Sequence, residues 1–121
     1  MLRRLVTISA VTMLVTCLSS VTQAGDWSEW RPFGTTGISI RFAQVNRTTC
    51  TWAFRNDSSR VLKSMSFRID DINAESGRPE QSSDQIPWSL RPGQSIGGWT
   101  AFTAEADCST VRITSTSIEW Q

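Results

Sequence analysis

One polar stretch of this chain concentrates the oxygen-bearing side chains that could bind a metal ion. Residues 70–77 read DDINAESG, in which Asp71, Asn73 and Glu75 alternate. Alternating oxygen ligands are typical of calcium loops, because Ca²⁺ takes six to eight of them. The glycine comes one position late, however, and no Glu stands at the closing position. A solvated connection between strands is the favoured interpretation, and a calcium site is the alternative.

Six tryptophans are the second group of candidates for a functional surface. Exposed Trp can stack on sugars or anchor a protein partner. Trp52 falls on the inward parity of its strand and is assigned to the core. Trp88 and Trp99 have Pro or Gly neighbours, which predicts edge or rim positions that could serve the core or a partner. Trp27 and Trp30 precede the first strand and could cover an open end or present a binding segment.

The basic residues are almost all arginines, because Lys63 is the only Lys. Arginine stacks on aromatic rings and makes forked hydrogen bonds with carboxylates. Four arginines occupy strand positions on the parity opposite the core residues, namely Arg41, Arg55, Arg68 and Arg112. If neighbouring strands carry them, they form one Arg-rich stripe on an outer sheet face. The alternative is four ordinary solvated positions.

Several chemistries are excluded by composition. The chain contains no His and no Tyr, so Ser-His-Asp and Cys-His arrangements and His-ligated metal sites cannot form. No phosphate-binding glycine loop and no GxSxG occurs. An enzyme would have to rest on carboxylates alone. The sequence therefore favours a protein that is not an enzyme and needs no cofactor.

The first 24 residues have the layout of a secretory signal peptide. Arg3 and Arg4 precede an apolar run over residues 5–21, and small residues lead to a cleavage position after Ala24. This run is shorter and more polar than a membrane anchor, which needs about 20 apolar residues. A lipoprotein processed at Cys17 is the alternative. The expected mature chain, residues 25–121, forms one domain in the periplasm or the extracellular medium.

Charge and cysteine content narrow the partners of the mature chain. Lys and Arg number 12 and Asp and Glu 11, and removal of Arg3 and Arg4 leaves the chain close to neutral. Such a chain lacks the basic excess that nucleic acids or anionic membranes require. After export, Cys50 and Cys108 are expected to form a disulfide, and two buried thiols are the alternative.

The elements that must position these residues are short strands. Apolar and β-branched residues alternate with polar ones between Gly, Pro, Asn and Ser turns, as in an antiparallel β-sandwich of about six or seven strands. The expected strands are residues 38–43, 50–54, 61–69, 86–90, 95–104 and 110–120, with a long loop at 70–85.

Local breaks in the alternation predict irregularities. Lys63 interrupts the apolar register of its strand, which predicts a bulge, an edge position or a side chain that extends its charged end to solvent. The Gly-Gly pair at residues 97–98 is expected to weaken its strand or to make a bulge. The RPGQ sequence at residues 91–94 predicts a type II turn. The apolar parity of the last strand slips before Ile118.

Two motifs carry a family resemblance, RNDSS at residues 55–59 and LRPGQS at residues 90–95. Over residues 52–93 the chain resembles small exported bacterial domains with an immunoglobulin-like or fibronectin-type β-sandwich. The chain departs from antibody domains, because Trp52 lies on the same strand as Cys50. The resemblance implies the fold alone.

The function predicted from the sequence is an exported, non-catalytic domain that binds a protein or a cell-envelope polymer. Its candidate contact residues are the four arginines together with Trp27, Trp30, Trp88 and Trp99. One alternative is a glycan-binding module, which needs exposed tryptophans in a row or cleft. Another is a small enzyme inhibitor that presents the loop at 70–85. The sequence leaves the oligomeric state open.

Overall fold

The computed structural model describes residues 26–104 and 107–121. The predicted signal peptide and the alternative lipidation position Cys17 lie outside the described residues. The strands are β2 (Arg31–Pro32), β3 (Ile38–Asn46), β4 (Thr49–Asn56), β5 (Leu62–Ile72), β6 (Pro79–Gln85), β7 (Ser95–Phe102) and β8 (Arg112–Trp120), and η2 (Cys108–Thr110) is a 3-10 turn.

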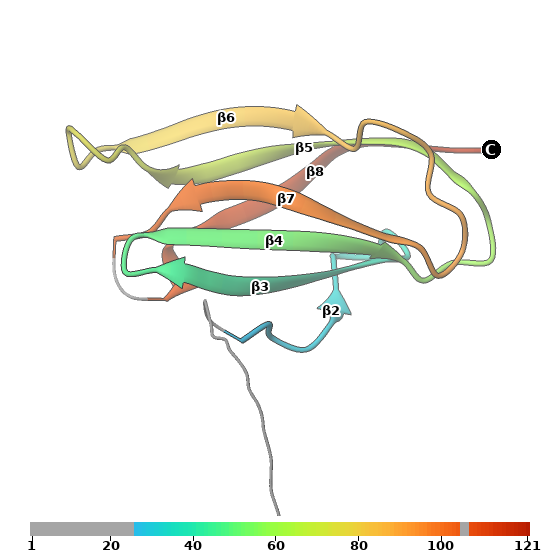
Figure 1. Ribbon diagram of the computed structural model, residues 1–121. Coiled ribbons are helices and arrows are strands. Elements are labelled where there is room, and N and C mark those ends of the chain that lie inside the picture. The colour runs from blue at the N-terminus through green and yellow to red at the C-terminus, as the bar shows by residue number, and fades with distance from the viewer. Residues whose placement is uncertain (1–25, 105–106) are drawn as a thin grey trace, which may run out of the picture.

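The strands form two antiparallel sheets that pack face to face (Figure 1). One sheet has the order β2-β3-β4-β7 and the other has the order β6-β5-β8. This arrangement confirms the predicted all-β sandwich. The immunoglobulin-like assignment is a finer statement about topology and stays a prediction.

The core lies between the sheets because the central strands β4 and β5 alternate buried with more accessible residues. Trp52, Phe54, Phe67, Leu62 and Met65 are completely buried. Large apolar side chains of this kind each stabilise a fold by about 1.5–3 kcal/mol when buried. The aromatic rings of Phe54 and Phe67 lie 5.0 Å apart and join the two sheets.

Two of the predicted elements are wrong. Residues 70–85 are not a loop, because β5 continues to Ile72 and residues 79–85 form strand β6. All seven β6 residues are exposed, so this strand lacks the apolar alternation that marks a half-buried strand. Residues 86–90 form no strand, and only Leu90 makes an isolated bridge, to Leu62. Pro87 has no N–H to donate there.

The predicted irregularities are confirmed. The pairing of β5 with β8 shifts between Leu62 and Ser64, which leaves Lys63 exposed in a bulge. A second shift in the same pair, opposite Ser66 and Phe67, explains the parity slip of the last strand. The pairing of β4 with β7 shifts at the Gly-Gly pair.

The RPGQ turn is also confirmed. The N–H of Gln94 donates to the carbonyl of Arg91 over 3.0 Å, and Gly93 has φ +85°. A positive φ at this position is what a type II turn requires, and Gly adopts it without strain.

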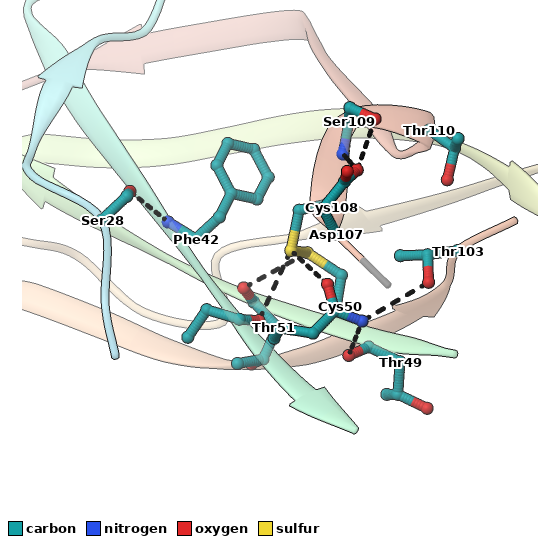
Figure 2. The surroundings of a disulfide bond; sticks show 12 residues. Ser28, Phe42, Thr49, Cys50, Thr51, Thr103, Asp107, Cys108, Ser109 and Thr110 are labelled. Atoms are coloured by element: carbon teal, nitrogen blue, oxygen red, sulfur yellow. Dashed lines mark hydrogen bonds between the residues drawn. A yellow bond between two sulfur atoms is a disulfide. The ribbon is translucent and has the colours of Figure 1, made fainter. Parts of the chain in front are cut away.

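A disulfide links Cys50 in β4 to Cys108 in η2, as predicted (Figure 2). The two cysteines are 58 positions apart in the sequence and their Cα atoms lie 5.5 Å apart. Cys50 is completely buried. The bond therefore ties a central strand of the four-stranded sheet to the segment that leads into β8.

Among the described residues there is no helix long and apolar enough to cross a membrane.

Candidate functional site

Residues 26–30, which precede β2, run along the edge of β3. Ser28 fixes them there. The N–H of Ser28 donates to the carbonyl of Phe42 over 2.7 Å, and the N–H of Phe42 donates to the Ser28 hydroxyl over 3.0 Å. Figure 2 shows the second of these bonds. Ser28 therefore satisfies backbone groups that β2 is too short to reach. This attachment places Trp27 and Trp30 beside the sheet.

The two tryptophans pack on arginines of β3 and β4. The guanidinium carbon of Arg41 lies 4.6 Å from the ring centre of Trp27 and 4.5 Å from that of Trp30. The guanidinium carbon of Arg55 lies 4.7 Å from the Trp30 ring centre. All three distances are within the range of cation–π attraction. We call Trp27, Arg41, Trp30 and Arg55 the Arg–Trp ladder.

Strand register explains how the two arginines come together. Arg41 is directly opposite Ala53, and Arg55 is directly opposite Ser39. Residues opposite each other, or two apart on one strand, share a sheet face. Both arginines therefore lie on the outer face of the four-stranded sheet. Ala53 and Ser39 are buried on that outer face, which shows that the side chains above cover it.

One end of the ladder is neutralised by Asp57. The Nε of Arg55 donates to Oδ1 of Asp57 over 2.5 Å, and the Ser39 hydroxyl donates to Oδ2 of the same carboxylate. The hydrogen bond from Arg55, followed by that from Ser39, lowers the pKa of Asp57 below its ordinary value. The carboxylate is therefore ionised at neutral pH and holds Arg55 in place.

Arg41 lacks such a carboxylate. Within residues 26–104 and 107–121 its guanidinium forms no ion pair, and its Nε is buried without a hydrogen-bond partner. A guanidinium has five N–H donors in one plane and loses none of them to a stacked ring. The Arg41 guanidinium is therefore a cation that the two indole rings hold in place, and among the described residues it has no carboxylate partner in the plane of its N–H groups.

Comparisons with protein-family models, curated proteins and solved structures return no match. The candidate site is therefore defined by geometry and chemistry alone.

The other two arginines do not belong to this site, so the predicted single stripe is wrong. Arg68 is in β5 and Arg112 is in β8, and both lie on the outer face of the three-stranded sheet because Arg112 is opposite Asp70, two positions from Arg68. The Nε of Arg68 lies 3.2 Å from Oδ2 of Asp70. Parity alone could not reveal that the four arginines are divided between the two sheets.

The remaining candidate tryptophans have separate roles. Trp99 faces the core, where its ring stacks on Trp52 and lies 5.1 Å from the Phe67 ring centre. Trp88 lies in the β6–β7 connection and is 63% exposed. Neither residue is part of the ladder. Trp99 thus supports the fold, and Trp88 is a separate exposed aromatic.

Two large apolar side chains are exposed on the side of the four-stranded sheet that carries the ladder. Trp27 is 42% exposed, and Phe102, at the end of β7, is 41% exposed. Phe102 is opposite Thr49 of β4, so it shares the outer face with Arg55. Trp27 also lines a groove of about 550 Å³, together with Asp26, Asp107 and the disulfide residue Cys108. Trp27 thus belongs both to the ladder and to the margin of the groove.

The three calcium candidates make separate contacts in the structure. The side-chain oxygen of Asn73 accepts the N–H groups of Glu75 and Ser76, both over 2.9 Å, and so closes the β5–β6 hairpin. Asp71 instead accepts the N–H of Phe102 over 3.4 Å. In the part of the chain that the structure describes, no group of three or more His, Cys, Asp or Glu side chains could hold a metal.

Sequence reasoning identified the ladder residues but missed their supports. Asp57 and Ser39 hold Arg55, and Phe102 is a further exposed aromatic on the same sheet face. The signal for Asp57 was present, since an Asp two positions after a strand Arg can reach it along the chain. No local signal marked Ser39 or Phe102, because their positions depend on strand register.

Proposed function

We propose that this protein is an exported, non-catalytic domain that binds a protein partner through the outer face of its four-stranded sheet. The observation that carries the proposal is Arg41, a cation fixed by two indoles and left without an anionic partner among the described residues. A fixed guanidinium loses little side-chain entropy on binding, so a preorganised Arg binds more tightly than a mobile one.

The surroundings of Arg41 support a protein as the partner. Trp and Arg are the residues most enriched at the energetic centres of protein interfaces. Trp27 and Phe102 supply exposed aromatic surface on the same side of the molecule. A partner that brings a carboxylate to the edge of the Arg41 guanidinium, with apolar side chains around it, would satisfy both features.

The groove beside Trp27 favours a glycan as the second candidate. Its volume of about 550 Å³ is within the usual range for small-molecule sites. Asp26 and Asp107 at its margin could accept hydrogen bonds from sugar hydroxyls. Trp30 already contacts two guanidiniums, however, so the row of free tryptophans that a glycan module needs is absent from the ladder. The inhibitor alternative loses its loop, because residues 79–85 are a strand.

A position-specific photocrosslinking experiment tests the proposal. A photoreactive residue replaces exposed Thr100 on the outer face of the four-stranded sheet, or exposed Arg112 on the other sheet as the matched control. In cells of the source organism we expect a discrete adduct from position 100, reduced by Arg41→Ala and retained by Arg41→Lys. Equal adducts from both positions, or an adduct indifferent to Arg41→Ala, would overturn the proposal.

A further inference from the structure

The free edges of the two sheets differ in how they are protected. A free edge exposes unpaired backbone groups, and proteins usually cover or distort it. At one edge of the four-stranded sheet, Ser28 bonds to β3 beyond the short strand β2. At its other edge, β7 contains the Gly98 irregularity. Strand β8 has two register shifts against β5. These three edges are therefore covered or bulged.

Strand β6 has none of these devices. Seven consecutive residue pairs join it to β5 without a register shift, from Ser66 opposite Gln85 to Ile72 opposite Pro79. Pro79 is only the first residue of the strand, and no Lys occurs in it. In Figure 1, β6 lies at the outer margin of its sheet with no strand beyond it. Among the described residues β6 is therefore the regular, uncovered edge.

One hydrogen bond fixes which backbone groups point to the free edge. The N–H of Ile86 donates to the carbonyl of Met65 over 2.9 Å. Backbone direction alternates along a strand, so Gln81, Ser83 and Gln85 point their N–H and C=O groups away from β5. The N–H of Gln85 is capped by Oδ1 of Asp84 over 2.8 Å. The edge groups of Gln81 and Ser83 are the ones that remain for a new strand.

The charges of β6 specify what kind of strand could add. Glu80 and Asp84 are separated by four positions and therefore share one face. In an antiparallel pairing of two copies centred on Ser82, Glu80 of one copy would face Asp84 of the other. Like charges directly opposite are destabilising. That register is therefore disfavoured for two copies of β6, whereas a basic segment would place opposite charges across from Glu80 and Asp84.

We propose that β6 accepts an extended basic segment of a partner protein by strand addition, with Lys or Arg opposite Glu80 and Asp84. Main-chain hydrogen bonds to Gln81 and Ser83 would supply affinity, and the alternating charges would supply specificity. This surface is on the three-stranded sheet, so the inference stands independently of the Arg–Trp ladder.

Peptide titration tests the inference. The probes are a seven-residue alternating Lys–Thr peptide and a matched Glu–Thr peptide, titrated into the oxidised mature protein by calorimetry. We expect saturable binding of the Lys–Thr peptide only, with slowed amide hydrogen exchange at Gln81 and Ser83. The Glu80→Lys/Asp84→Lys variant should bind the Lys–Thr peptide roughly tenfold more weakly and should bind the Glu–Thr peptide instead, because two cross-strand charge pairs change sign.

A backbone variant separates strand addition from simple charge attraction. Ser83→Pro removes an edge-facing N–H without removing a bond to β5, whereas Ser83→Ala keeps that N–H. Strand addition requires that Ser83→Pro abolish binding and that Ser83→Ala retain it, with both variants folded by circular dichroism. Equal binding by the two variants, no binding of the Lys–Thr peptide, or dimerisation through β6 in sedimentation would each overturn the inference.

Discussion

The guanidinium carbon of Arg41 lies 4.5 Å from the ring centre of Trp30, and the strand register explains the contact, because Arg31, the residue after Trp30, is paired with Ile40, the residue before Arg41. This contact, with that of Trp27, holds the N-terminal segment against β3. The two hydrogen bonds of Ser28 also attach this segment to β3, and the pairing of β2 with β3 begins directly after it. Arg41 therefore has a structural role that can be measured without knowing the partner.

Replacement of Arg41 should loosen the N-terminal segment. A cation–π contact contributes roughly 0.5–1 kcal/mol at an exposed site and more when desolvated, so Arg41→Ala should lower the free energy of unfolding by about 1 kcal/mol in a urea titration. Amide exchange at Ser28 should also become faster. Arg112→Ala is the matched control, because Arg112 is exposed on the other sheet. Equal losses in the two variants would contradict a specific role for the ladder.

Most of the fold could be predicted from the sequence because most strands bury one face. The strands around Trp52 and Phe67 show apolar residues at alternate positions, and that period identifies a half-buried strand directly. Strand β6 was missed for the same physical reason. It is exposed on both faces and is held by backbone hydrogen bonds to β5, which leave no mark on side-chain composition.

The candidate site was predictable in residue type and not in arrangement. Arg41 and Arg55 were recognised as outward-facing, and Trp27 and Trp30 as candidates for contact. Their packing on one another depends on the return of the N-terminal segment along β3 and on the register of β3 with β4. Both are non-local, so periodicity within a single strand carries no information about them.

Tryptophan substitutions should separate the core from the surface. Trp99 contacts Trp52, Phe54 and Phe67, so Trp99→Ala should lower the free energy of unfolding by roughly 3–5 kcal/mol. Trp88 is 63% exposed, so Trp88→Ala should change it by no more than about 0.5 kcal/mol. Denaturant titrations of the two variants provide the comparison. A large loss for Trp88→Ala would show that its ring packs on the protein.

Removal of the disulfide should destabilise the domain strongly. Cys50 and Cys108 are 58 positions apart, and a crosslink over a loop of that length stabilises by about 4 kcal/mol in the chain-entropy model. Cys50→Ala/Cys108→Ala should show this loss in a denaturant titration. Adding reductant during the denaturant titration should lower the free energy of unfolding of the wild type. It should leave that of the double variant unchanged. A double variant as stable as the oxidised wild type would refute the expectation.

Asp71 should destabilise the fold at neutral pH. Burial, followed by the charges of Glu80 and Asp70, raises the pKa of Asp71 above its ordinary value, against the hydrogen bond from Phe102. A raised pKa means that the folded protein binds the proton more tightly, so stability is lost as pH rises through that pKa. Asp71→Asn should therefore raise the melting temperature at pH 7, and the gain should disappear at acid pH, where Asp71 is protonated.

Asp57→Asn is the control of opposite sign. Because the pKa of Asp57 is lowered, its carboxylate stabilises the fold at pH values above the ordinary Asp pKa, and this stabilisation is lost as pH falls. The Asp57→Asn variant should therefore melt at a lower temperature than the wild type at pH 7 and match the wild type in acid. If Asp71→Asn melted below the wild type at pH 7, the carboxylate would be stabilising and its assigned environment wrong.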